Sequence, residues 1–244
     1  MAYLKDKHER GLRSKTVAIG IDPLKALTTG IDNIAIGTSV ADALTTGICN
    51  VAIGANALGA STTGCFNIAL GDTALGGADT TGLYNVAIGA NALDAMTSGK
   101  ENVAIGRNNL GASTTGCKNI AIGNGPMSGA DTTGINNIAI GTSAADALTT
   151  GLCNIAIGTD ALGASTSGCL NVAIGELALG TGDITGHCNV AIGPAAGTAV
   201  TGGSEGGVFI GRSAGAGVSS GSQNIAIGCL TLGVATVTVL IILE

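Results

Sequence analysis

The sequence predicts an all-β fold, specifically a parallel β-solenoid or β-roll of about 13 coils, each about 17–18 residues long. The pattern (Val/Ile)-x-(Ile/Leu)-Gly occurs 13 times. The glycines that close it recur every ~17–18 residues, and so strict a period indicates a repeat architecture. Apolar residues make up 45% of the chain, aromatic residues only 2%, and Trp is absent. The core is therefore expected to be thin and built from small aliphatic side chains.

The strand of each coil is predicted between an asparagine and the closing glycine. β-Branched residues alternate there with alanine, a period of two that favours a short strand. We expect the Val/Ile positions to face inward and the alanine outward. Equivalent positions of stacked coils lie above one another, so the asparagines are predicted to form a hydrogen-bonded ladder. They are Asn33, Asn50, Asn67, Asn85, Asn102, Asn119, Asn137, Asn154, Asn171, Asn189 and Asn224.

The longer arm of each coil runs from the closing glycine to a second glycine, usually within Thr-Thr-Gly. Many of these arms carry a leucine at the fourth position after the closing glycine, such as Leu58 and Leu75. Glycine is expected where the backbone needs a positive φ or approaches a neighbour closely. Strand, turn, second edge and turn make one coil, and no segment has a helical pattern.

A longer period of about 52 residues is superimposed on the first, because every third unit has one extra residue. Two interpretations of this super-repeat remain open. In one, a block of three coils has been duplicated. In the other, the whole super-repeat forms a single three-sided turn, with one shorter unit on each side. The length of the solenoid distinguishes them, since neighbouring coils are about 4.8 Å apart.

The chain is predicted to contain three segments. Residues 1–15 hold five of the ten Lys and Arg residues and form a polar cap, tail or attachment segment. Residues 16–233 form the solenoid. Residues 234–244 are predicted to form an apolar strand, which would either pack on other chains or belong to a longer parent protein, since an exposed strand of this kind favours aggregation.

Composition argues against several functional classes. The net charge of −6, with 11% charged residues, offers no basic surface for nucleic acid. No apolar run approaches the length that a membrane-spanning helix needs. The first residues lack the apolar segment of a secretory signal. We therefore expect synthesis in the cytoplasm without a signal peptide, and a final location in a virion or an extracellular fibre.

The sequence predicts no catalytic, cofactor or metal site, and hence no enzyme. The seven cysteines recur in equivalent slots and are expected to be buried small hydrophobic residues rather than disulfides or metal ligands. One aspartate in each super-repeat (Asp79, Asp131 and Asp183) is expected to cap a turn. A calcium ladder is the alternative, but the Gly-Gly-x-Gly-x-Asp repeat of calcium-binding rolls is missing.

The reiterated Asn-x-Ala-Ile-Gly motif resembles the head repeats of YadA-like trimeric autotransporter adhesins. With Ala-Leu and Thr-Thr-Gly between the motifs, it is more similar to repeats of bacteriophage tail fibres. The resemblance covers about residues 16–233 and implies a β-roll that assembles as a homotrimer. The unit is longer than that of the adhesin heads, and no heptad stalk or anchor barrel is seen, which favours a virion component.

We therefore expect a structural fibre protein, such as the shaft or tip of a phage-type tail fibre, that forms a rigid trimeric rod. Its partners would be identical copies, other virion or fibre proteins bound through the termini, and a host surface receptor. One alternative is an adhesin head that binds a receptor or glycan, with Phe209 as a possible contact in the irregular region 194–223. A less favoured alternative is an ice-binding solenoid displaying its threonine pairs.

Overall fold

A computed structural model describes residues 15–233 and confirms the all-β solenoid. The described residues contain 13 strands and no helix. The strands are β1 (Val17–Ile21), β2 (Ile34–Thr38), β3 (Val51–Ile53), β4 (Ile68–Leu70), β5 (Val86–Ile88), β6 (Val103–Ile105), β7 (Ile120–Ile122), β8 (Ile138–Ile140), β9 (Ile155–Ile157), β10 (Val172–Ile174), β11 (Val190–Ile192), β12 (Val208–Ile210) and β13 (Ile225–Ile227).

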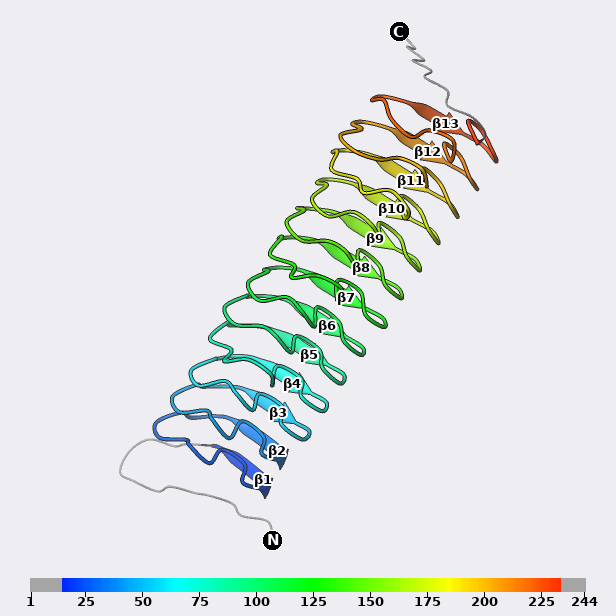
Figure 1. Ribbon diagram of the computed structural model, residues 1–244. Coiled ribbons are helices and arrows are strands. Elements are labelled where there is room, and N and C mark those ends of the chain that lie inside the picture. The colour runs from blue at the N-terminus through cyan, green and yellow to red at the C-terminus, as the bar shows by residue number, and fades with distance from the viewer. Residues whose placement is uncertain (1–14, 234–244) are drawn as a thin grey trace. The chain divides into compact units, whose positions relative to one another are not determined.

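The chain divides into two compact units between Lys118 and Asn119, the first with β1–β6 and the second with β7–β13. Within each unit the strands are parallel and stacked in chain order (Figure 1), so that Ala52 lies beside Ala69 and Ala139 beside Ala156. The hydroxyl of Thr28 donates to the carbonyl of Thr45, its equivalent in the next sequence repeat. One repeat of 17 or 18 residues is therefore one coil, and the interpretation of the super-repeat as a three-sided turn is wrong.

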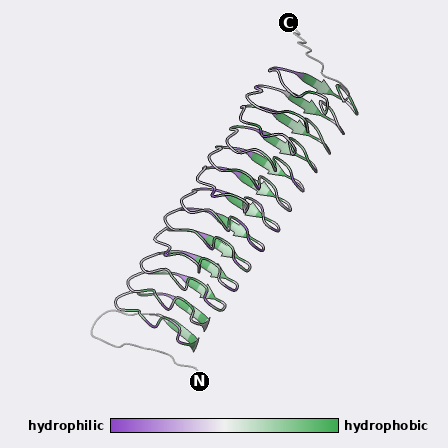
Figure 2. Ribbon diagram, viewed as in Figure 1, coloured by the Kyte–Doolittle hydropathy of each residue, from purple (hydrophilic) through white to green (hydrophobic). Residues whose placement is uncertain are grey.

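The side of each strand that faces the core is the opposite of the predicted one. The alanines at the centre of the strands are buried, and Ala35, Ala87 and Ala104 are 0% exposed. The residues on either side of each alanine point outward, with Ile88 36% and Ile105 38% exposed. The reason is steric, because the longer arm fills the thin interior with leucines and leaves room only for a methyl group beneath the strand. Figure 2 shows the hydrophobic colouring concentrated on the strands.

The opposite wall of the core comes from the longer arm. Leu58, Leu75 and Leu162 are fully buried, as are other leucines in this slot. Leu75 has a φ of 51°, in the left-handed region that side chains rarely adopt. The stacked coils sustain this conformation, since the amide of Leu75 donates to the carbonyl of Ala92 in the next coil at 2.9 Å.

The two kinds of glycine have different causes. Gly89 closes the motif of β5 and has a φ of 128°. Gly47, in Thr-Thr-Gly, has no positive φ, but a Cβ there would lie 2.6 Å from Cδ1 of Leu44 and closer still to the carbonyl oxygen of Gly64. The closing glycines therefore combine a positive φ with a close approach to the next coil, whereas Gly47 is required by the close approach alone.

Both terminal predictions lie outside the described residues, apart from Lys15 itself, which is exposed. They concern the polar segment 1–15 and the apolar strand 234–244. Among the residues that the structure describes, no helix has the length and apolar character needed to cross a membrane.

Candidate functional site

The most distinctive surface of each unit is formed by the outward residues of its strands, which we call the strand face. It comprises the first and third residues of the Val/Ile-x-Ile/Leu motif in every coil. In the first unit these are Val17, Ile19, Ile34, Ile36, Val51, Ile53, Ile68, Leu70, Val86, Ile88, Val103 and Ile105. In the second they are Ile120, Ile122, Ile138, Ile140, Ile155, Ile157, Val172, Ile174, Val190, Ile192, Val208, Ile210, Ile225 and Ile227. Every position is Val, Ile or Leu, and none is buried.

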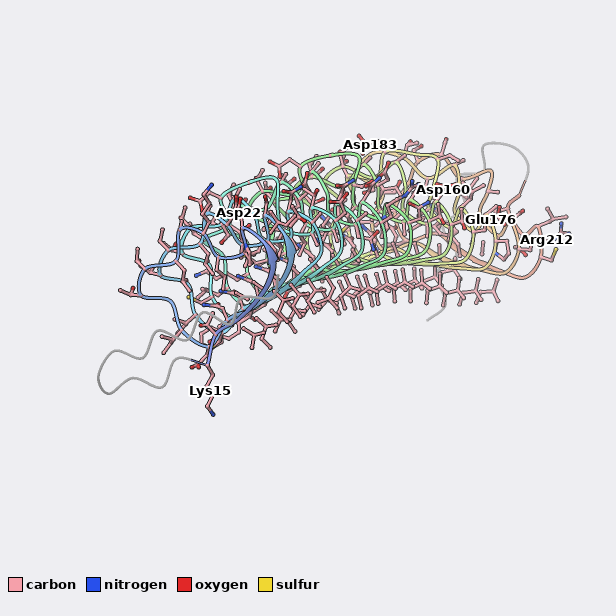
Figure 3. All side chains as sticks on the ribbon, turned by 90° about the horizontal axis from the view of Figure 1, so that it is seen from below. Lys15, Asp22, Asp160, Glu176, Asp183 and Arg212 are labelled. Atoms are coloured by element: carbon pink, nitrogen blue, oxygen red, sulfur yellow. The ribbon has the colours of Figure 1, made fainter. Side chains whose placement is uncertain are left out.

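The strand face is flat because its side chains stack in parallel register. Within each unit, the residues at these positions lie directly beside their equivalents in the next strand, for example Val86 beside Val103. Figure 3 shows them as a row of carbon-only side chains projecting from the strands. Asp183, by contrast, lies on the side away from this row. An extended apolar surface without a charged residue is typical of a protein interaction site.

Behind the strand face, the asparagines are buried and hydrogen-bonded from coil to coil. Asn67 is typical, with a side chain that is 0% exposed. Its amide nitrogen Nδ2 donates to the carbonyl of Gly82 at 3.0 Å. Its Oδ1 accepts from the backbone amide of Asn85 at 2.9 Å and from Nδ2 of Asn85 at 3.2 Å. Each side chain thus satisfies backbone groups that the turn would leave unpaired.

Asn67→Ala is expected to destabilise the protein by about 2–3 kcal/mol, because it leaves the Gly82 carbonyl and the Asn85 amide buried without partners. Thermal and urea unfolding followed by circular dichroism would measure the loss. Thr63→Ala is a matched control, since Thr63 is exposed and its hydroxyl makes no hydrogen bond within the described part of the chain. Equal stability of the two variants would contradict a structural role for the ladder.

The asparagine ladder is interrupted in the β12 coil, where Gly207 takes the place of the asparagine. Two residues later, Phe209 takes the place of the alanine. Phe209 is 1% exposed, so its predicted role as a receptor contact is wrong. Its ring fills space vacated by three glycines. A Cβ at Gly197 or Gly207 would lie 2.9 or 2.7 Å from ring atoms, and one at Gly215 would also overlap the ring. The irregular sequence here is therefore a repacked core.

The threonine pairs lie on a different edge and form an interrupted array. Thr45 donates its hydroxyl to the carbonyl of Thr62 at 3.0 Å, so the first threonine of the pair ties neighbouring coils together. In the coils with the extra residue, Thr80, Thr132 and Ile184 turn into the core, where each is 0% exposed. This breaks the outward threonine register that an ice-binding face needs.

Aspartates cap the preceding coil at two of these insertions, as predicted. Oδ1 of Asp79 accepts hydrogen bonds from the backbone amide and hydroxyl of Thr62 at 2.8 and 2.9 Å. Asp183 accepts the same pair from Thr166 at 3.0 and 2.9 Å. These carboxylates are committed to coil packing.

Asp94 is a half-buried aspartate on the longer arm that follows β5. Burial raises the pKa of its carboxyl, and the backbone amide of Gly77 offsets this only in part. Its Oδ1 is buried without a hydrogen-bond partner in the described structure. In the second unit, by contrast, Oδ1 of Asp146 accepts from the backbone amide of Gly129 at 2.7 Å. Because the pKa of Asp94 is raised in the folded chain, its ionisation destabilises the folded state, and stability is lost as pH rises from the usual pKa of a carboxyl group through the raised value.

The cysteines are not buried, contrary to the prediction. Cys153, Cys188 and Cys229 are exposed, and the other four are half-buried; all seven are free thiols. Cys49, Cys153 and Cys188 directly precede an inward-facing asparagine, so with a period of two their side chains face outward. Within residues 15–233, no three His, Cys, Asp or Glu side chains are placed to hold a metal ion.

Two aromatic side chains, Phe66 and Tyr84, are exposed at the position directly before the ladder asparagine in consecutive coils. The rings of Phe66 and Tyr84 stack with centroids 5.0 Å apart and an interplanar angle of 12°. They are 39% and 54% exposed.

Comparison of the chain with protein-family models, curated proteins and solved structures gives no match.

Proposed function

We propose that this protein is a structural fibre or spike component, most similar in role to a phage tail-fibre shaft or tip, whose strand face packs against identical copies. One observation carries the proposal. In every coil, Val, Ile or Leu side chains point outward from the strand, and in every coil except that of β12 an alanine points inward. A chain that functions alone gains stability by burying its larger aliphatic side chains. This arrangement instead leaves them available to a partner.

The chemistry of the strand face favours a second copy as that partner. The surface is flat, periodic and without charge, so only an equally flat and apolar surface can cover it without leaving polar groups unpaired. The same face on another copy has this character and the same coil spacing. We propose a homotrimer, in which the equivalent strand faces of three copies pack against one another around a three-fold axis.

Ile53→Lys combined with Ile88→Lys is expected to convert the assembly into folded monomers. Ile53 and Ile88 are 37% and 36% exposed, so lysine is tolerated in the single chain. In the assembly, it buries unpaired charges and should weaken association by more than about a hundredfold. Light scattering and native mass spectrometry measure the state, and circular dichroism checks folding.

The matched control is Thr46→Lys combined with Thr63→Lys, which adds the same charge at exposed positions on the threonine edge. This variant should assemble like the parent chain. A parent chain that stays monomeric at high concentration would refute the proposal, and dissociation of the control would show that added charge alone is responsible.

A receptor-binding role is the second candidate, and the Phe66–Tyr84 pair favours it. Exposed aromatic rings are the usual platform for sugars and other flat ligands. However, the 5.0 Å separation of the rings matches the spacing of the coils, so each covers one face of the other. The pair therefore also serves as packing between coils, and the fibre role remains the main proposal.

A further inference from the structure

Four of the seven cysteines form two pairs on consecutive coils. In the first unit, Cys49 directly precedes the asparagine of the β3 coil, and Cys65 lies two residues before that of the β4 coil. In the second unit, Cys153 and Cys169 occupy the same two places in the β9 and β10 coils. Each pair lies within a single unit, so the same arrangement occurs once in each unit.

The structure directs the thiol of Cys65 toward the coil that carries Cys49. The amide of Phe66 donates to the carbonyl of Ile48 at 3.0 Å, which places Cys65 beside Ile48. Cys49 is the next residue along the chain and is therefore the diagonal neighbour of Cys65. Sγ of Cys65 also accepts a hydrogen bond from the amide of Ile48 at 3.3 Å. The thiol thus reaches the backbone of the neighbouring coil one residue before Cys49.

The second pair has the same geometry. Sγ of Cys169 accepts from the amide of Leu152 at 3.3 Å, and Cys153 is the residue that follows. Cys188, in the β11 coil, is the other diagonal neighbour of Cys169, because its amide donates to the carbonyl of Cys169 at 3.2 Å. Cys188 lies on the side of Cys169 away from Leu152, so the direction of the thiol selects Cys153.

The spacing of each pair suits a disulfide. Neighbouring coils are about 4.8 Å apart and successive residues advance about 3.3 Å, so diagonal neighbours have Cα atoms roughly 6 Å apart. Cysteines joined by a disulfide usually have Cα atoms about 4.4–6.8 Å apart. Cys153 is exposed and the other three thiols are half-buried, so an oxidant in solution can reach them. We propose that disulfides form between Cys49 and Cys65 and between Cys153 and Cys169, and that each staples two consecutive coils.

The remaining three cysteines lack a partner at this offset. One coil before Cys117, Glu101 stands where a cysteine would be needed. One coil after Cys188, Glu205 stands there. Cys229 follows the closing glycine of the β13 coil, at the other end of the strand. The proposal therefore distinguishes four stapling thiols from three single ones, and it does not rest on the proposed function.

A small disulfide such as glutathione disulfide is a sufficient oxidant. One thiolate of the pair attacks it, which releases one glutathione thiolate and leaves the other glutathione joined to the protein. The second thiolate of the pair then displaces that glutathione. One S–S bond breaks and one forms, two electrons pass from the cysteine pair to the oxidant, and the two thiol protons pass to the glutathione thiolates through water.

Reaction of the full-length protein with excess glutathione disulfide tests the pairing. Cys117, Cys188 and Cys229 should stop at the mixed disulfide, so the intact mass should show three glutathione adducts per chain instead of seven. Non-reducing mass spectrometry of thermolysin peptides should identify the two staples, and non-reducing gels should show single chains. Adducts on the four stapling thiols, a Cys169–Cys188 linkage, or disulfides between chains in place of the staples would overturn the proposal.

Glu101→Cys supplies the missing partner of Cys117 and tests the offset itself. This variant should form a third staple and lose the adduct on Cys117, leaving two adducts per chain. The same substitution in a Cys117→Ser background is the matched control and should instead carry an adduct at position 101. An adduct on Cys117 in the Glu101→Cys variant would show that the diagonal offset does not permit a disulfide.

Thermal unfolding measures what the staples do. Each closes a loop of about 17 residues, so oxidation should raise the melting temperature by at least about 5 °C, and dithiothreitol should reverse the rise. Cys49→Ser with Cys153→Ser should abolish this shift, whereas Cys117→Ser with Cys188→Ser should retain it. Circular dichroism of the reduced variants checks folding, and alanine replaces serine where a variant does not fold. A shift that is absent in the parent, or equal in both variants, would overturn stapling.

Discussion

Ala87→Asp is expected to unfold the β5 coil and destabilise the first unit by about 3–5 kcal/mol. Ala87 is 0% exposed and lies between Ala69 and Ala104 of the neighbouring strands. A carboxylate there has no partner and no space, because the leucines of the longer arm fill the interior. Loss of the cooperative melt in circular dichroism, already at concentrations where the chain is monomeric, is the expected result.

Ile88→Asp is the control, one residue along the same strand. Ile88 is 36% exposed, so aspartate there stays hydrated in the single chain and should cost less than about 1 kcal/mol. It should nevertheless impair self-association. Equal destabilisation of the two monomeric variants would mean that the strand orientation is wrong.

Gly89→Ala should be nearly as damaging, although it adds a single methyl group. The φ of Gly89 is 128°, a conformation that residues with a Cβ rarely adopt. The added Cβ would lie 2.6 Å from the carbonyl carbon of Gly106 in the next coil and still closer to its oxygen. The coils must therefore separate or the turn must rearrange, at an expected cost of more than about 3 kcal/mol. Urea unfolding measures it.

Gly203→Ala provides the comparison for this substitution, since a Cβ there would meet no atom of the described residues within 4 Å. Its expected effect is within about 0.5 kcal/mol. A comparable loss for both variants would show that the contact between consecutive closing glycines does not matter.

The sequence was sufficient to predict the repeat, the strands and the positions of the asparagine ladder, because these follow from the spacing of the motifs and the alternation within them. It left open whether one coil was a single repeat or the whole super-repeat, and the hydrogen bonds between consecutive repeats decided for the single repeat. It misled on which side of the strand faces inward. Period-two alternation is satisfied by either side, and we gave the interior to the larger residues. A better signal was present: Asn33 directly precedes β2 and lies two residues from Ala35, so in extended backbone the two side chains must share a face. A ladder of hydrogen-bonded asparagines inside therefore requires alanine inside.

The same parity argument applies to Phe209 and the cysteines. Phe209 occupies the alanine slot and so faces inward, whereas Cys153 and Cys188 precede the asparagine and face outward. The Phe66–Tyr84 stack depended on two coils of different length meeting in register, which spacing alone did not reveal. The sequence analysis missed the strand face because it assigned the Val and Ile positions to the interior, although their repetition in every coil was recognised.

The short separation along the chain of most coil-to-coil hydrogen bonds also bears on how the chain folds. Thr28 and Thr45 are 17 positions apart, and Asn67 and Asn85 are 18. In a chain of 244 residues, this gives a relative contact order of about 0.07. That value is typical of helical bundles, whereas β-sandwiches lie at about 0.16–0.22.

Such a low contact order favours growth by addition. Once two or three coils have formed a nucleus, each further coil closes only a short loop and docks on the one before it. The protein should therefore fold progressively during synthesis, at a rate set by its first coils and nearly independent of how many follow.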